Sequence, residues 1–249
     1  MVATTPNGLG RGVEAAIMST TAVIAGVGPG LGTSVARKFA REGCDVALLA
    51  RTESYLQDLA RDLDETAGSG LAVPTDVTDP EGVADAFERI RDAFGPVDAL
   101  VVNASGGAWK GLRDIDVDEF DRAMAVGPRG GLLCSQAAVD DMLDGDGGTI
   151  IFTGATSAVR GREGAVGFSA AKFAVRGMAE SMARELGPQG IHVAHAVIDG
   201  GIEPPDRAVD DPEEYLDPDA IAESYWHLVE QDRSAWTLEL DLRPHVEEF

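Results

Sequence analysis

Short apolar runs alternate with longer stretches of helical periodicity along almost the whole chain. The apolar runs, which we predict to be β-strands, are Thr21–Ala25, Asp45–Ala50, Leu71–Thr75, Ala99–Asn103, Thr149–Thr153, His192–Ile198 and Trp236–Leu242. Between them, apolar residues recur at three- and four-residue spacings in Leu31–Glu42, Ser54–Ala67, Glu81–Phe94, Asp118–Leu143, Phe168–Leu186 and Asp219–Glu230. This alternation predicts a doubly wound α/β sandwich, in which a seven-stranded parallel sheet carries helices on both faces.

The domain organisation is predicted to be simple. The chain has 249 residues, of which 44% are hydrophobic, and shows no repeat or interdomain linker, so residues 21–249 should form a single domain. Residues 1–20 lack strong periodicity and are expected to form a poorly ordered N-terminal arm. Gly127-Pro128 interrupts the fourth helical stretch, where the missing proline N–H predicts a kink or a shortened helix.

The charge balance argues against several kinds of partner. The chain has 20 Lys and Arg but 43 Asp and Glu, which gives a formal net charge of −23. Phosphate backbones and anionic lipids are bound by clustered Lys and Arg, so we expect no nucleic acid and no membrane as partners. Because salt screens repulsion between carboxylates, the acidity favours a halophilic source over an ordinary acidic protein.

Cysteine and histidine usage points to a reducing compartment without a metal site. Cys44 and Cys134 are the only cysteines, which excludes a disulfide framework. His192 and His195 lie three residues apart in a predicted strand, so their side chains should face opposite sides and cannot share one ion. No apolar run approaches the ~20 residues of a membrane-spanning helix. We therefore expect a cytoplasmic protein.

A glycine-rich loop follows the first predicted strand and precedes an amphipathic helix. Such a loop lets the backbone approach a pyrophosphate at the helix N-terminus, although it could also be a turn that binds nothing. The candidate cofactor-binding residues here are Gly26, Gly28, Gly30, Leu31 and Gly32. Their spacing is GxxxGxG rather than GxGxxG, and it resembles the nucleotide loop of the short-chain dehydrogenase/reductase family.

Further landmarks of that family appear in order along the chain. Asp76-Val77 follows the third strand, where the resemblance implies a contact to adenine, and Asn103-Ala104-Ser105-Gly106 resembles the family's Asn-Ala-Gly turn after the fourth. The resemblance extends from about Thr21 to Pro244. It implies a Rossmann-like sheet with the strand order 3-2-1-4-5-6-7 and ligands at the carboxyl ends of the strands.

The end of the second strand bears on the choice of cofactor. Arg51 stands where a carboxylate would hold the ribose 2′-hydroxyl of NAD, and its planar guanidinium suits the 2′-phosphate of NADP. NADP is therefore the predicted cofactor, with NAD as the alternative. In a second interpretation Arg51 only stacks on adenine or faces solvent.

The catalytic positions depart from the family pattern. Phe168 occupies the position of the family's catalytic Tyr, four residues before Lys172 and on the same face of a helix. Ala155 stands where the usual spacing places the catalytic Ser, so Thr156 or Ser157 would have to substitute for it. The chain resembles an atypical subgroup in which Phe replaces Tyr and the Lys is kept. That resemblance implies that Lys172 still binds the nicotinamide ribose.

Two further family positions are altered. Gly127 stands at the position of the family's Asn, and Asp199-Gly200 replaces the Pro-Gly that usually follows the sixth strand. The segment 202–216 is predicted to be a lid, and its acidity disfavours a strongly anionic substrate.

Two functions remain in competition. The first is an NADP-dependent oxidoreductase that transfers hydride to or from a small carbonyl or alcohol, with reduction of a carbon–carbon double bond as an alternative. Thr156, Ser157 or a water held by Lys172 would be its non-standard proton donor. The alternative is a dinucleotide-binding protein without turnover, a sensor or the inactive partner in an oligomer. Small residues along 118–143 and 168–186 favour a homodimer or homotetramer in either case, because family members commonly pair through these helices.

Overall fold

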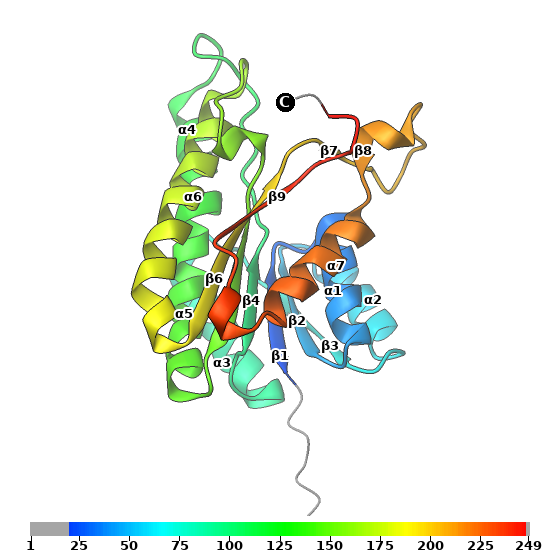
Figure 1. Cartoon of the computed structure of the whole chain (residues 1–249), viewed down its shortest axis with the longest axis vertical. Helices are drawn as coiled ribbons and strands as arrows, with labels where there is room; N and C mark the ends of the chain where they lie inside the picture. Colours follow the sequence, from blue (N-terminus) through cyan, green and yellow to red (C-terminus); the bar gives the residue numbers. More distant parts are fainter. Residues whose placement is uncertain (1–19, 248–249) are drawn as a thin grey trace, which may run out of the picture.

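The computed structural model of the chain describes residues 20–247. The main strands are β1 Thr21–Ala25, β2 Asp45–Ala50, β3 Ser69–Pro74, β4 Ala99–Val102, β5 Gly148–Thr153, β6 Ile191–Ile198 and β9 Glu239–Leu242. They form one parallel sheet in the order β3-β2-β1-β4-β5-β6-β9, which confirms the predicted topology (Figure 1). Apart from Thr20, the predicted N-terminal arm lies outside the described residues.

Two features near the C-terminal end of the sheet differ from the prediction. β9 begins at Glu239 instead of Trp236, because the Thr237 N–H donates to the Gln231 side chain at 2.8 Å and holds the preceding residues in a turn. In addition, β7 Gly201–Ile202 and β8 Tyr215–Leu216 pair in a separate small sheet at the two ends of the predicted lid. Strands of two residues are too short to produce a hydrophobic pattern.

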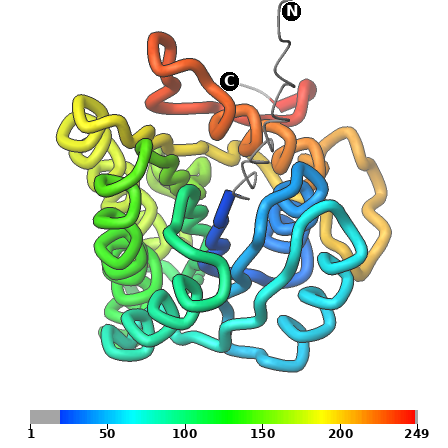
Figure 2. The backbone as a smooth tube through the Cα atoms, turned by 90° about the horizontal axis from the view of Figure 1, so that it is seen from below, coloured from blue at the N-terminus to red at the C-terminus, as the bar shows by residue number. Residues whose placement is uncertain are grey.

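Helices cover both faces of the main sheet, as predicted (Figure 2). On one face lie α1 Leu31–Arg41, α2 Glu53–Leu63 and α7 Pro218–Val229, and on the other α3 Pro80–Phe94, α5 Gly130–Asp144 and α6 Val166–Leu186. Successive strand residues point to opposite faces, so Ile24 belongs to the first core and Val23 to the second. The central strands of the sheet are therefore buried on both sides, as their apolar runs require, whereas the residues of the edge strand β9 are exposed or half-buried.

The fourth helical stretch is divided, as expected at Gly127-Pro128. α4 Val117–Met124 leads into one π-helical turn, Ala125–Arg129, and then into α5. Pro128 lies inside this turn and has no N–H to donate, so the regular hydrogen-bond ladder cannot continue through it. Gly127 is buried in the same turn, next to α6.

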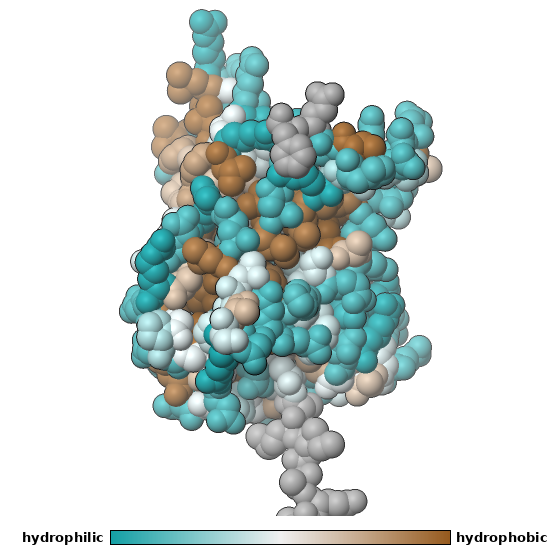
Figure 3. Space-filling view, viewed as in Figure 1, coloured by the Kyte–Doolittle hydropathy of each residue, from teal (hydrophilic) through white to brown (hydrophobic). Residues whose placement is uncertain are grey.

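The described residues include no helix that is both long and apolar enough to cross a membrane. In space-filling view, apolar side chains gather in the middle of one face, between the α6 side and the α7 side, while hydrophilic residues cover most of the surrounding surface (Figure 3).

Candidate active site

Two adjoining cavities lie at the carboxyl ends of the strands, where ligands bind in open α/β sheets. The larger cavity, of about 930 Å³, extends from the glycine-rich loop to Lys172. The smaller cavity, of about 610 Å³, extends from the same loop to Arg51. Gly26, Gly28 and Asn103 line both, so the loop that follows β1 separates one elongated space into two parts.

The glycine-rich loop can only be built from glycine at its tightest point. Gly26 has φ of +108°, and a Cβ there would lie 2.3 Å from the backbone nitrogen of Ala104. The Asn103 side chain donates to the Gly26 carbonyl at 2.7 Å and ties the loop to the end of β4. A Cβ on Gly32 would approach the same carbonyl to 2.7 Å.

α1 begins beside this loop with unoccupied hydrogen-bond donors. Its N-cap residue is Gly30, which has no side chain to accept from the first N–H groups, and the first turn carries no acidic residue. Leu31, Gly28 and Pro29 line the larger cavity here. The N-terminus of α1 therefore offers free N–H groups and a positive dipole end, which fit the pyrophosphate of a dinucleotide.

Charged side chains line the smaller cavity. Arg51, Asp76 and Val77 are brought together there, as the sequence predicted, and Arg122 of α4 joins them. Hydrogen bonds from the Thr78 backbone N–H and hydroxyl lower the pKa of the Asp76 carboxyl, and the charges on Arg51 and Arg122 lower it further. Arg122 was missed by the sequence analysis, because no pattern within α4 indicates which side chain reaches this cavity.

Lys172 and Phe168 line the larger cavity from α6, as predicted. The Lys172 side chain is buried, and its ammonium donates to the Thr153 carbonyl at 2.7 Å. Burial lowers the pKa of Lys172 to about 8, from its usual value near 10.5. The Lys172 nitrogen lies 5.6 Å from the centre of the Phe168 ring, and that ring presents no hydroxyl to the cavity.

Trp109 covers the Phe168 ring. The two rings are stacked with their centres 4.3 Å apart, and Trp109 also lines the larger cavity. Trp109 comes from a loop after β4 that carries no recognisable motif, so its role could not have been predicted from spacing. The Phe168 ring therefore has two neighbours in this cavity, the Trp109 ring and the Lys172 ammonium.

Thr156 and Ser157 both line the larger cavity, in a short turn after β5, but their hydroxyls differ in environment. Thr156 donates its hydroxyl proton to Asp199 at 2.6 Å. Ser157 is buried, and its hydroxyl has no hydrogen-bond partner among residues 20–247. Of the two predicted candidates, only Ser157 thus has a hydroxyl proton free to be donated into the cavity.

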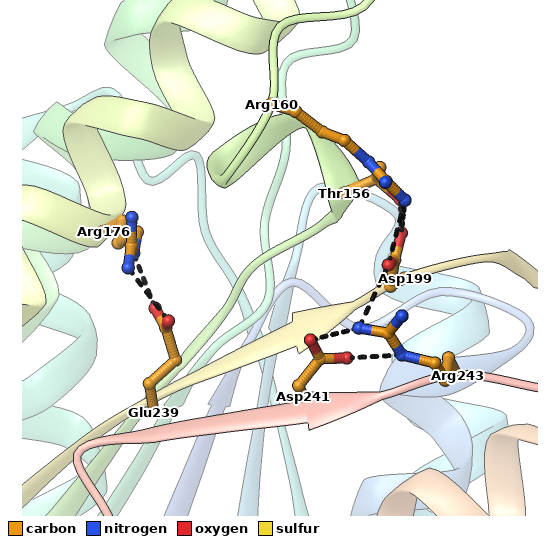
Figure 4. Close-up of polar contacts among 7 residues, drawn as sticks. All are labelled: Thr156, Arg160, Arg176, Asp199, Glu239, Asp241 and Arg243. Carbon is orange, nitrogen blue, oxygen red and sulfur yellow. Dashed lines mark hydrogen bonds and ion pairs between the residues drawn. The ribbon is translucent and has the colours of Figure 1, made fainter. Parts of the chain in front are cut away.

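Asp199 is the centre of a network of ion pairs beside this turn (Figure 4). The guanidinium of Arg160 contacts both carboxylate oxygens at 3.1 Å, and Arg243 of the segment after β9 lies 3.4 Å away. Burial raises the pKa of the Asp199 carboxyl, but the bond from Thr156 and the charges on Arg160 and Arg243 outweigh burial, so the pKa is lowered overall. Asp199 therefore stays ionised and fixes the wall of the larger cavity.

The histidines of β6 do not contribute to either cavity. His192 bonds to the carbonyls of Leu228 and Thr237, and His195 bonds to Glu239 at 3.0 Å. Glu239 is also paired with Arg176 of α6 (Figure 4). Within residues 20–247, no three His, Cys, Asp or Glu side chains are grouped so that they could hold a metal ion.

Comparison with known proteins agrees with this geometry. The short chain dehydrogenase family matches residues 20–212. An uncharacterised oxidoreductase of Staphylococcus aureus (strain N315) is 30% identical over 226 residues, which cover 90% of this chain and 96% of the relative.

Two solved structures show the same arrangement. A short-chain dehydrogenase from Rhodopseudomonas palustris has a TM-score of 0.79 at 31% identity and covers 91% of this chain and 99% of its own. An alcohol dehydrogenase from the archaeon Thermococcus sibiricus, complexed with 5-hydroxy-NADP, has a TM-score of 0.82 at 25% identity, covering 92% and 98%. Together with the glycine-rich loop and the buried Lys172, these matches show that the chain belongs to the short-chain dehydrogenase family of oxidoreductase enzymes.

Proposed function

We propose that this protein is an NADP-dependent oxidoreductase that transfers hydride to or from a small carbonyl or alcohol substrate. The observation that carries the proposal is the pair of adjoining cavities at the carboxyl ends of the strands, with Arg51 in one, Lys172 in the other and the glycine-rich loop lining both. A dinucleotide bound there supplies the hydride chemistry, and the protein positions the reactants. The complex of the Thermococcus sibiricus relative supports NADP as the cofactor.

Each part of the site has a distinct task in this proposal. The N–H groups at the start of α1 bind the pyrophosphate, while Asp76 and Val77 border the adenine site. Arg51 binds the 2′-phosphate, and Arg122 adds a second positive charge to the same cavity. Lys172 binds the nicotinamide ribose through its ammonium.

Proton transfer requires a donor other than the missing phenol. The Thr156 hydroxyl donates its proton to Asp199, so that proton is not available to the substrate. The Thr156 oxygen can still accept a hydrogen bond from a substrate hydroxyl. Ser157, or a water held by Lys172, is the proposed donor. Phe168 beside Lys172 supports membership of the subgroup in which Phe replaces Tyr.

The proposal extends to the environment and assembly of the protein. The net charge of −23 supports a halophilic source, and the two free, buried cysteines support a cytoplasmic location. Leu132 of α5 and Phe173 of α6 are partly exposed apolar side chains, which supports a homodimer or homotetramer built on these helices.

Cofactor choice is tested by titrating NADP(H) and NAD(H) into the wild type and Arg51→Ala. A charge-assisted bond contributes about 1.5–3 kcal/mol, so NADP(H) should bind roughly ten- to a hundredfold more tightly than NAD(H). Arg51→Ala should remove most of this preference, and Arg89→Ala, at an exposed position of α3, is the matched control. Equal affinity of the wild type for both cofactors would refute the assignment.

Catalysis is tested by comparing the wild type with Phe168→Tyr in NADPH oxidation against a panel of carbonyl compounds. A positioned general acid contributes about 10²–10⁴ in rate, so restoring the phenol beside Lys172 should raise a slow turnover by up to that factor. If the wild type turns over briskly and Phe168→Tyr slows it, a different proton path operates. If both proteins bind NADPH and neither oxidises it, the protein binds the dinucleotide without turnover.

A further inference from the structure

One cation of the larger cavity has a charged group with neither an ion pair nor a hydrogen bond to the described residues, the guanidinium of Arg162. Three basic residues and one acidic residue line it, namely Arg160, Arg162, Lys172 and Glu247. Arg160 is paired with Asp199, and Lys172 donates to a backbone carbonyl. Arg162 makes no ion pair with any residue between 20 and 247, although the chain has 43 acidic residues.

Two acidic residues at the wall of this cavity already have cationic neighbours other than Arg162. Asp199 is held by Arg160 and Arg243, and Glu247 lies within electrostatic reach of Arg243. The predicted lid contributes only Ile202 to the cavity lining, so its acidic residues do not face the ligand space. The prediction that the lid disfavours an anionic substrate therefore does not apply inside the larger cavity.

Two contacts position Arg162, one through its backbone and one through its side chain. Its backbone N–H donates to the Ser169 hydroxyl at 3.2 Å, which ties the loop before α6 to that helix. Its guanidinium lies over the Trp109 ring, 5.6 Å from the centre of the ring. A cation–π contact does not use the N–H groups of a guanidinium as hydrogen-bond donors, and these groups match a carboxylate in a two-bond arrangement.

An apolar wall adjoins this cation. Trp109 and Phe168 are stacked and both line the larger cavity, and Trp109 is 56% exposed. A large exposed aromatic side chain at the mouth of a cavity is typical of a ligand contact. The phenol missing at Phe168 makes this wall more apolar than it would be in a member of the family with Tyr.

We propose that the substrate is a carbonyl or alcohol compound with a carboxylate group, which Arg162 binds while Trp109 and Phe168 contact its apolar body. The proposal names the substrate class of the oxidoreductase site and so rests on the proposed function. It makes Arg162 a specificity-determining residue, located outside the positions that hold the cofactor.

The test measures binding of matched acids and esters by calorimetry, with and without saturating dinucleotide. The probes are 4-acetylbenzoate and benzoylformate, each compared with its methyl ester. For the better acid of the two, the wild type should bind the carboxylate about tenfold or more tightly than the ester, as expected for a charge-assisted bond. Quenching of tryptophan fluorescence, lost in Trp109→Phe, should accompany binding.

Variants identify the source of the preference. Arg162→Gln should bind acid and ester equally, Arg162→Lys should keep part of the preference as a single point charge, and Arg89→Gln should behave as the wild type. A wild type that does not distinguish acid from ester, an unchanged preference in Arg162→Gln, or no binding of either acid at millimolar concentration would overturn the proposal. Binding of acid without any turnover would instead refute the oxidoreductase function and leave the Arg162 site standing.

Discussion

Phe168 and Lys172 lie one helical turn apart on α6, but different parts of the protein determine their environments. Lys172 is held by the end of β5 through the Thr153 carbonyl, whereas Phe168 is held by Trp109 from a distant loop. The pair itself could be predicted from its four-residue spacing. Trp109 and Arg162 could not, because both come from loops whose position depends on the packing of the whole sheet.

The buried ammonium of Lys172 predicts a pH dependence of cofactor binding. The pKa of Lys172 is about 8 in the free protein, and the proposed bond to the ribose requires the charged form. Below pH 8 the group is already protonated, so affinity should be constant. Above it, binding must take up a proton, and the affinity should fall by up to about tenfold per pH unit.

This dependence is measured by titrating the dinucleotide between about pH 7 and pH 10. Burial raises the pKa of the Cys44 and Cys134 thiols to about 12, so these groups do not titrate in the range. Lys172→Met should bind more weakly than the wild type at neutral pH and with no pH dependence. A flat profile in the wild type would show that the ammonium does not bind the ribose.

At the scale of elements, the sequence predicts buried strands better than their connections. β1 and β2 begin and end where predicted, because each is an uninterrupted apolar run buried on both faces. β9 starts three residues later than predicted, because Thr237, two residues before it, makes two hydrogen bonds with the Gln231 side chain. The cofactor loop was predictable since it joins two such well-defined elements.

The junction of β1 and α1 should tolerate substitution very unevenly. In Gly26→Ala, the new Cβ would meet the Ala104 backbone at 2.3 Å with φ at +108°. We expect a loss of about 3 kcal/mol or more in unfolding free energy, and a melting temperature lower by roughly 10 °C. Dinucleotide binding should be lost with it.

Gly28→Ala is the matched control for this loop. No atom lies within 4 Å of a Cβ at Gly28, so the fold should keep its stability. Gly28 lines both cavities, however, so the added methyl group would project into the space proposed for the dinucleotide. We therefore expect Gly28→Ala to bind the dinucleotide more weakly than the wild type does. Thermal unfolding and cofactor titration of both variants separate the two effects, and equal stability of Gly26→Ala and the wild type would contradict the close packing of the loop.

Across the whole molecule, charge and fold are independent features of the sequence. The sheet order follows from the alternation of strands and helices together with the family resemblance, while the net charge of −23 is distributed over the surface that surrounds the apolar core. The proposed substrate site depends on both, because the fold brings Arg162 to the larger cavity without an ion pair to the described residues, in a chain with a net charge of −23. Which basic side chains have an acidic partner depends on contacts in the folded protein, so it could not be predicted from the composition of the chain.

The acidic surface predicts that salt stabilises the protein. Repulsion among carboxylates at a net charge of −23 destabilises the folded state, and molar salt shortens the screening length to about 3 Å. Salt also weakens surface ion pairs such as Arg37–Asp62, but each of these contributes only about 0–1 kcal/mol. The repulsion should dominate, so the melting temperature should rise by roughly 10 °C between low salt and molar KCl.

A variant without three exposed carboxylates tests whether KCl stabilises the protein by screening the repulsion between carboxylates or by a general effect of salt on folding. Asp121, Asp140 and Asp144 are exposed and unpaired within the described part of the chain, and Asp144 ends α5, where the helix dipole already disfavours a negative charge. With all three changed to Asn, the protein should melt at a higher temperature in low salt and gain less from KCl. A wild type that is fully stable in dilute buffer and gains no stability from KCl would contradict this prediction. The acidity would then not be an adaptation to salt. The carboxylates would have to lie far enough apart to repel one another only weakly.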